Sequence, residues 1–137
     1  MTAPLIQQAA KFCTSPETLF EMYMDSETHS EATGAPAKMS RDLGGSWSAH
    51  GGQIGGKNLM ILPGRMIVQA WRAAHWKKED ISVLILCFSK LSDGARLDLV
   101  HVGVPEYDHE GVSQGWPKYY WEPWRLYIKA QKKRRRG

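Results

Sequence analysis

The residue best placed for chemistry in this sequence is a histidine on an apolar strand. Leu97, Leu99 and His101 alternate, so a strand over 96–104 places these three side chains on one face. If the leucines face an interior cavity, the imidazole of His101 faces it too. It could then hold a ligand by one hydrogen bond, or act as a general acid or base with a pKa near neutrality. The alternative is a buried neutral histidine that is hydrogen-bonded to the backbone or to a tyrosine.

Aromatic residues are the second feature, since the chain contains six tryptophans. Trp116, Tyr120, Trp124 and Ile128 recur every four residues, with Val112 one turn earlier, which predicts the apolar face of a long amphipathic helix. Each ring buries about 150–250 Å². This face therefore requires a large concave partner.

Strands in the middle of the chain are expected to supply that partner, with Trp47 and Trp71 facing the helix. The rings then either fill the core completely or line a pocket that they do not fill. Under the second interpretation, the following residues are the candidates for ligand binding: Trp47, Leu59, Ile61, Trp71, His101, Trp116, Tyr120 and Trp124.

Other kinds of site have weak signals. Asp25 and His29 are four residues apart with Glu27 between them, but a zinc site uses three or four ligands, and Asp25 is explained as a helix N-cap. We therefore predict no metal site and no cofactor. The paired glycines at 51–52 and 55–56 do not match a nucleotide-binding loop, and no catalytic triad or paired-carboxylate motif is recognisable.

Turn and cap signals predict the elements that position these residues. A strand over 5–14 precedes a helix capped by Ser15, and a second short helix opens at Asp25 and ends at Gly34. About six short strands joined by tight turns follow, and the aromatic helix closes the chain. The predicted fold is α+β: a curved antiparallel sheet of about six to seven strands that grips a long C-terminal helix.

Two details of this prediction concern proline and tryptophan. Pro123 is expected to kink the last helix around Tyr119, and Pro117 to restart it after a break. Trp76 lies in a polar loop, where we expect an exposed side chain that plugs the pocket mouth.

Several strings also resemble a known family, over roughly residues 5–130. They occur in this order: Gly44-Gly45-Ser46-Trp47, Gly55-Gly56-Lys57-Asn58-Leu59, Pro63-Gly64-Arg65, Ala70-Trp71-Arg72, the Leu97, Leu99, His101 alternation with Val104-Pro105, and Gly115-Trp116 before Tyr120-Trp121. Together they resemble the Aha1-like (activator of Hsp90 ATPase homologue) branch of the START/Bet v 1-like superfamily. The resemblance implies a helix-grip fold with an apolar cavity between the sheet and the C-terminal helix. Its relatives include lipid and hormone binders, polyketide cyclases and chaperone regulators, so it leaves the activity open.

Composition sets the remaining expectations. The net charge of +4 comes largely from residues 132–136, so we expect one domain over 1–131 and a frayed basic tail over 132–137, without a specific nucleic-acid partner. No apolar run is long enough for a membrane span and no secretion signal is visible, which favours the cytoplasm. Cys13 and Cys87 are expected to be buried, reduced thiols.

Three functions remain in competition at this point. The first is a binding module, monomeric or homodimeric, for a small hydrophobic or aromatic molecule. The second is a protein-interaction role with a chaperone of the Hsp90 type, which the resemblance implies. The third is a cyclase- or hydrolase-type enzyme that would use His101 together with Tyr120 or Arg72.

Overall fold

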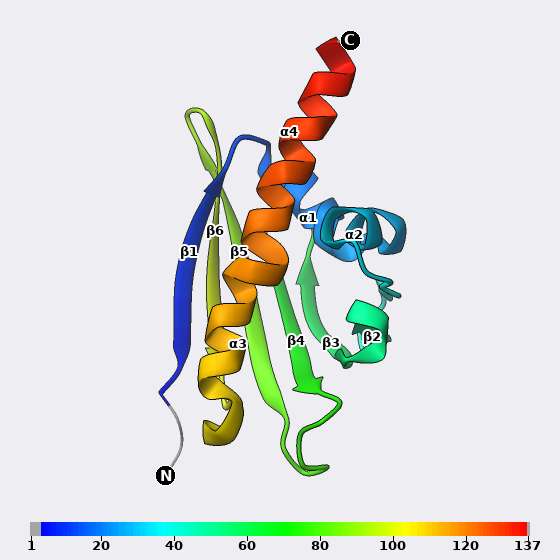
Figure 1. Cartoon of the computed structure of the whole chain (residues 1–137), viewed down its shortest axis with the longest axis vertical. Coiled ribbons are helices and arrows are strands. Elements are labelled where there is room, and N and C mark those ends of the chain that lie inside the picture. The colour runs from blue at the N-terminus through cyan, green and yellow to red at the C-terminus, as the bar shows by residue number, and fades with distance from the viewer. Residues whose placement is uncertain (1–3, 137) are drawn as a thin grey trace.

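The computed structural model describes residues 4–136, and its helices and strands follow the predicted order (Figure 1). The strands are β1 (Ile6–Phe12), β2 (Ser46–Ala49), β3 (Ile54–Leu62), β4 (Met66–Ala73), β5 (Ser82–Leu91) and β6 (Gly94–Val102). The helices are α1 (Pro16–Met24), α2 (Ser26–Thr33), α3 (His109–Trp116) and α4 (Glu122–Arg136), and a π-helical turn over Pro117–Trp121 joins the last two.

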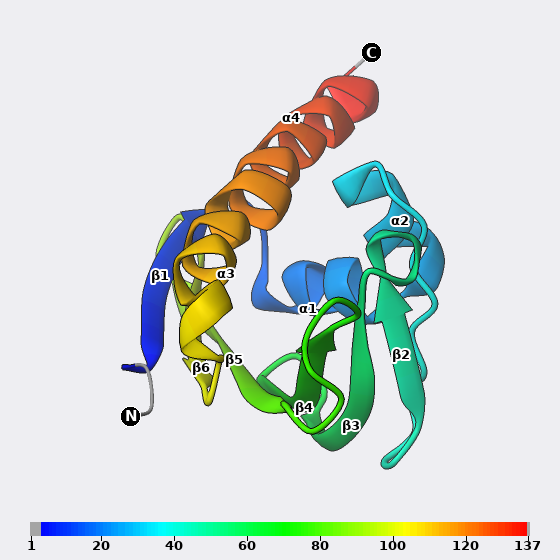
Figure 2. The ribbon, with the colours of Figure 1, turned by 60° about the horizontal axis from the view of Figure 1, so that its bottom comes forward.

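The six strands form one antiparallel sheet in the order β1-β6-β5-β4-β3-β2. Consecutive strands from β2 to β6 are neighbours, and β1 returns to pair with β6. Leu91 pairs with Gly94, so the hairpin turn between β5 and β6 consists of Ser92 and Asp93. The sheet curves around the C-terminal helix, which lies across its concave face (Figure 2). The predicted helix-grip α+β fold is confirmed.

Local capping chemistry explains the two short helices at the sheet edge. The Ser15 side chain accepts a hydrogen bond from the backbone N–H of Thr18, and Pro16 takes the first helical position. Asp25 accepts in the same way from the N–H of Thr28, which starts α2. Gly34 ends α2 in the left-handed conformation, with φ of 77°.

The long C-terminal helix carries the buried aromatic face that its spacing predicted. Trp116, Tyr120, Trp124 and Ile128 are all buried. The helix does not break at Pro117. Its backbone instead widens into the π-helical turn, where the N–H of Glu122 bonds to the carbonyl of Pro117.

Close backbone approach explains the glycine at position 56. A Cβ at Gly56 would overlap the carbonyl oxygen of Ala70 on β4, so only glycine fits there. The irregularity in the β3–β4 pairing falls a little later, between Asn58 and Met60.

The basic end and the thiols were both the subject of expectations, and the one about the thiols needs correction. At the basic end α4 continues as helix to Arg136, because Lys and Arg are good helix formers and extend a helix already fixed by Trp124 and Ile128. Fraying of this end from residue 132 stays a prediction. Cys13 is exposed and Cys87 half-buried, and both are free. Cys13 follows the last residue of β1, where the chain turns toward α1. None of the helices in the described part of the chain is long and apolar enough to cross a membrane.

Candidate functional site

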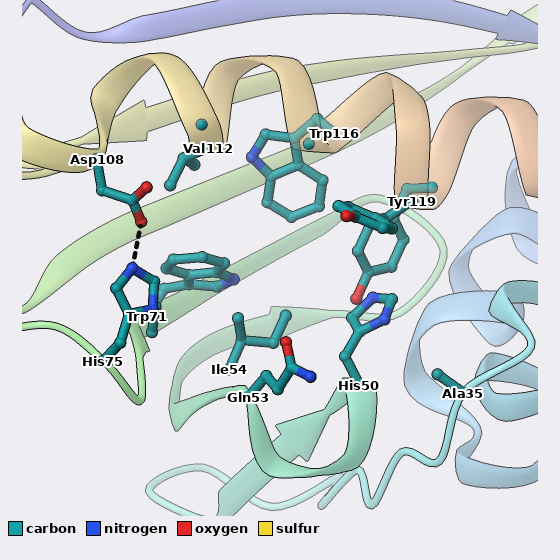
Figure 3. Close-up of a pocket in the computed structure, with 14 residues that line it drawn as sticks. Ala35, His50, Gln53, Ile54, Trp71, His75, Asp108, Val112, Trp116 and Tyr119 are labelled. Carbon is teal, nitrogen blue, oxygen red and sulfur yellow. Dashed lines mark ion pairs between the residues drawn. The ribbon is translucent and has the colours of Figure 1, made fainter.

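A pocket of about 500 Å³ lies between the sheet and the helix, and we call it the central pocket (Figure 3). Three of the predicted ligand-binding residues line it: Trp71, Trp116 and Tyr120. The other lining residues are Ala35, His50, Gln53, Ile54, Ala73, His75, Asp108, Gly111, Val112, Gly115 and Tyr119. Its volume falls within the range of small-molecule sites, roughly 300–1,000 Å³.

The alternation of β4 places the central tryptophan in this pocket. Along β4 every second residue is buried, so Trp71 faces inward together with Ile67 and Ala73. Opposite it, Trp116 and Tyr120 come from the closing helix. Gly115 sits beside them and presents no side chain to the pocket.

Two residues that line the pocket each have a buried ring nitrogen without a hydrogen-bond partner anywhere in residues 4–136: Nε1 of Trp71 and Nε2 of His50. A buried donor or acceptor left without a partner costs about 1–3 kcal/mol, so native cores contain few of them. A third such atom, Nε1 of Trp124, lies outside the pocket among the rings of Phe12, Tyr23 and Tyr120.

His50 is a pocket residue that the sequence analysis did not select. It follows β2 with φ of 52°, the one positive φ found at a non-glycine position within the described residues. Its ring meets Tyr119 and Tyr120 edge-on, with centroids 5.7 and 5.3 Å away. Burial lowers its pKa, so the imidazole is neutral at neutral pH. The signal that could have pointed to it is the Gly51-Gly52 pair, which allows the chain to turn His50 back toward the core.

The structure places His101 in the aromatic core, with both ring nitrogens occupied. Nε1–H of Trp116 donates to Nδ1 at 3.2 Å, so the imidazole proton is on Nε2, which lies 2.8 Å from Oγ of Ser82. The Ser82 hydroxyl in turn donates to the carbonyl of Trp71. Burial lowers the His101 pKa to about 3. Of the two sequence interpretations, these contacts match the buried neutral histidine, although its partners are a tryptophan and a serine.

A second hydrogen-bonded histidine fixes the phenol of the helix. The carbonyl of Tyr23 accepts from Nδ1 of His29 at 2.7 Å, and Nε2 accepts from the Tyr120 hydroxyl at 2.9 Å. Burial lowers the pKa of His29 to about 4 and raises that of Tyr120. Tyr120 therefore presents its ring to the central pocket while its hydroxyl points to α2.

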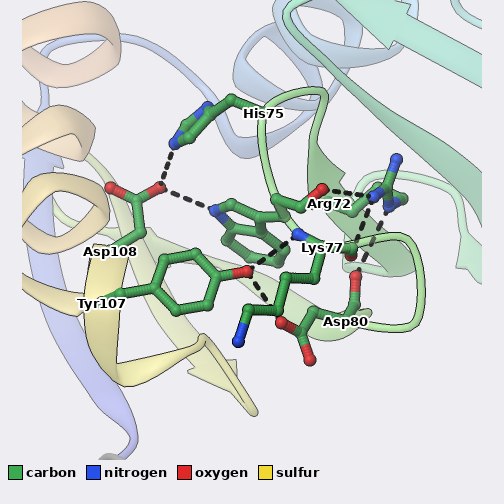
Figure 4. A network of polar contacts seen from close by, with 7 residues as sticks. Arg72, His75, Lys77, Asp80, Tyr107 and Asp108 are labelled. Carbon is green, nitrogen blue, oxygen red and sulfur yellow. Dashed lines mark hydrogen bonds and ion pairs between the residues drawn. The ribbon is translucent and has the colours of Figure 1, made fainter.

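One end of the pocket is bounded by a loop tied to the start of α3 (Figure 4). Asp108 accepts from Nε1 of Trp76 at 2.7 Å and pairs with His75 at 3.2 Å. The Tyr107 hydroxyl donates to Asp80 and accepts from the backbone N–H of Lys77. Trp76 was predicted to be exposed, but it is buried, because Asp108 provides its indole with a partner that the loop sequence does not reveal.

The remaining predicted ligand-binding residues lie away from the pocket wall. Trp47 and Trp124 are buried in the packed core, Leu59 is 51% exposed, and Ile61 is half-buried. Leu59 is next to the irregularity in the β3–β4 pairing, where strict alternation is lost.

The groups suggested for an enzyme do not meet either. Arg72 donates to the carbonyls of Trp76 and Lys77, and the hydrogen bonds of His101 and Tyr120 go to other partners. Within residues 4–136, no group of three His, Cys, Asp or Glu side chains is arranged to hold a metal ion.

Comparison with known proteins adds to this geometry. The family model described as "Activator of Hsp90 ATPase homolog 1-like protein" matches residues 13–123. The human "Activator of 90 kDa heat shock protein ATPase homolog 1" is 31% identical over 111 residues, which is 81% of this chain and 33% of the human protein. A Dictyostelium discoideum homologue is 28% identical over 120 residues, 85% of this chain and 31% of its own length. The chain thus spans about a third of the length of these curated relatives.

Solved structures show the same fold. A Plasmodium falciparum protein described as an HSP90 activator superposes with a TM-score of 0.85 at 22% identity, covering 93% of this chain and 97% of that one. CalU16 from Micromonospora echinospora gives 0.77 at 19% identity, covering 98% and 85%. Since the family model matches most of the chain, the protein belongs to the Activator of Hsp90 ATPase homolog 1-like family, in agreement with the motif resemblance.

Proposed function

We propose that this domain binds a chaperone of the Hsp90 type and stimulates its ATPase. The observation that carries the proposal is the 31% identity with the human activator across 81% of this chain. The family match and the fold of the Plasmodium activator support it. The cytoplasmic location expected from the sequence forms part of the same proposal.

The test is an ATPase assay with a purified Hsp90-type chaperone from the same organism. We expect the hydrolysis rate to rise with the concentration of the domain until it saturates. A rate that stays flat under conditions where a known activator works would contradict the proposal.

The basic end of α4 requires a control in this assay, because clustered positive charge attracts acidic proteins without specificity. Four exposed residues carry that charge: Lys132, Lys133, Arg134 and Arg135. A variant with all four replaced by serine should still stimulate the chaperone at physiological salt. If stimulation disappears with the charges and with added salt alike, the binding is non-specific ionic capture.

A second function is favoured by the central pocket. We propose that it binds a small, largely apolar molecule, because aromatic and aliphatic side chains line most of it. Native mass spectrometry of freshly purified protein should reveal a bound small molecule. Fluorescence of the tryptophans should also respond to members of a panel of lipids and aromatic compounds, whereas a flat response throughout would contradict this function.

A further inference from the structure

We propose that the domain contacts its chaperone through the convex side of the sheet, which we call the outer face. The complementary surface of the chaperone is apolar at its centre and acidic at its rim. This inference rests on the chaperone-binding function proposed above and adds the surface that performs it. Three features lead to it: an uncovered sheet face, apolar side chains across that face, and a basic rim.

No helix covers the outer face. All four helices lie on the concave side of the curved sheet (Figure 2). Their contacts with the sheet involve inward-facing residues, as in Phe20 with Phe88 and Trp116 with His101. An antiparallel sheet with one solvated face commonly alternates apolar residues inside with polar residues outside. The outer face would therefore be expected to be polar.

The strand register shows that it is apolar instead. Along β4 the outward-facing residues alternate with buried ones, and Val68 is one of them. Met60 pairs with Val68, Val68 with Ile85, and Ile85 with Val100, so one apolar row crosses four strands. Outward-facing cross-strand neighbours of this kind pack on one another.

The rows on either side are apolar as well. One runs from Leu62 on β3 to Cys87 on β5, and the other from Ala70 on β4 to Val102 on β6. Four strands at about 4.8 Å and three rows at about 6.7 Å cover roughly 400 Å². Exposed apolar patches of a few hundred Å² mark interaction sites.

Several of these side chains are well exposed to solvent. Met60 and Leu62 are each 46% exposed, and Val102 is 43% exposed. At the irregularity in the β3–β4 pairing, the two consecutive residues Leu59 and Met60 are both about half exposed. A partner that covers the outer face would therefore bury apolar surface that now meets water.

The charges around this apolar centre are mostly positive. Lys57 is next to Ala70 at one end, and Lys11 pairs with Arg96 at the other. The outward-facing charged residues of the six strands are Lys11, Lys57, Arg72, Arg96 and Asp98, which give this face a net charge of +3. Lys11 and Lys57 make no ion pair within residues 4–136. Carboxylates on the partner would complement them.

This combination favours an acidic protein surface over two other occupants. A second copy of the domain would bring two faces of net charge +3 together, and two convex surfaces touch over a small area. Faces that bind bilayers carry tryptophan, tyrosine or phenylalanine, and none of these is among the outward-facing residues of the six strands. Met60 and Met66 instead supply flexible side chains that adapt to a protein surface.

The first experiment tests the apolar centre in the chaperone ATPase assay with the double variant Met60→Gln/Leu62→Gln. Glutamine is similar in size, and both positions are about half exposed, so equilibrium unfolding in urea should be nearly unchanged. We expect the domain concentration for half-maximal stimulation to rise about tenfold, which corresponds to about 1.4 kcal/mol. Leu126→Gln is the matched control. Leu126 is 69% exposed on α4, away from the outer face, and its substitution should change nothing.

The second experiment tests the basic rim. Lys57→Glu should weaken binding of the chaperone, and binding should then depend less on salt concentration. Lys133→Glu makes the same change of charge at the end of α4 and should have little effect. Isothermal titration calorimetry at several salt concentrations measures both variants.

Two outcomes of these experiments would overturn the inference, and they differ in their consequence. If the wild-type domain stimulates the chaperone and the double variant stimulates it equally at the same concentrations, the outer face is not the docking surface, while the chaperone-binding function stands. If the wild-type domain neither binds nor stimulates the chaperone, the proposed function is wrong and the inference is wrong with it.

The two other occupants are tested with the same double variant. We expect the wild-type domain to be a monomer in sedimentation velocity and to remain in solution with vesicles of phosphatidylcholine and phosphatidylserine. A dimer that the double variant dissociates would assign the outer face to a second copy. Co-sedimentation with the vesicles that the double variant abolishes would assign it to a membrane surface. Either result would overturn the inference.

Discussion

Two histidines lie between the sheet and the closing helix, and their surroundings are opposite. His101 has a partner at each ring nitrogen, Trp116 on one side and Ser82 on the other. His50 has a buried Nε2 that meets no partner within the described chain. Both imidazoles are neutral because burial lowers their pKa values. A buried polar group with all its bonds made stabilises the fold, whereas a buried one without a partner costs free energy.

The largest effect should come from the fully bonded histidine. His101→Ala leaves the Trp116 indole N–H without its acceptor and creates a cavity, so we expect the free energy of unfolding to fall by about 3–5 kcal/mol. His50→Asn is the matched control, since asparagine tolerates positive φ, and it should cost less than about 1 kcal/mol. Equilibrium unfolding in urea measures both. Equal losses in the two variants would break the distinction between the two histidines.

Acidification should reduce stability through two buried, hydrogen-bonded histidines, His101 and His29. The folded-state pKa values of His101, about 3, and His29, about 4, lie below the ordinary value of 6.5. Below about pH 6.5 the unfolded chain therefore binds more protons than the folded one, and the unfolding free energy falls as pH falls. Between about pH 7.5 and pH 5.5 the two together should cost about 2–3 kcal/mol. Urea unfolding at each pH checks this, and a stability that rises toward pH 5.5 would contradict it.

A smaller effect is expected where a pocket residue also has a structural bond. Tyr120→Phe keeps the ring but removes the hydroxyl that His29 accepts from. We expect a loss of about 1–2 kcal/mol in unfolding free energy. The affinity for a ligand found in the panel of lipids and aromatic compounds should stay nearly constant, because the hydroxyl bonds to His29 and points away from the pocket. A large drop in affinity with no change in stability would place this hydroxyl among the ligand contacts.

The smallest effect should have the opposite sign. Gly115→Ala adds a Cβ whose nearest neighbour, the Tyr119 ring, is 3.5 Å away, an ordinary contact. Alanine in place of glycine within a helix should raise stability by up to about 1 kcal/mol. The same methyl narrows the central pocket, so the melting temperature without ligand should rise while the affinity for a ligand found in the panel should fall. A variant that loses stability would show that the helix surface is already filled at this point.

Much of the fold was predictable because its signals are local. The four-residue spacing of Trp116 and Tyr120 predicted the buried helix face, and Ser15 with Pro16 predicted where α1 begins. These signals depend on backbone geometry within a few residues, which sequence patterns record directly.

The site was predictable only in part. Trp71 was found because β4 alternates regularly. His50 was missed because alternation groups it with the outward-facing Ser46 and Ser48, and only its positive φ turns the ring inward. Trp76 was misassigned because its partner, Asp108, comes from a segment 32 residues later. Contacts between distant segments leave no local pattern in the sequence.

The π-helical turn over Pro117–Trp121 sets the phase of the C-terminal half of the closing helix. A strict four-residue repeat drifts by about 40° per step around an ideal α-helix. A widened turn takes up part of that drift and keeps Trp124 and Ile128 aimed at the sheet. It also lets Trp121 face inward next to Tyr120, where its indole donates to Gln8 on β1. Deleting a single residue from this turn would rotate the whole of α4 about its axis. The length of the turn must therefore stay constant for the buried face of α4 to keep its contacts with the sheet.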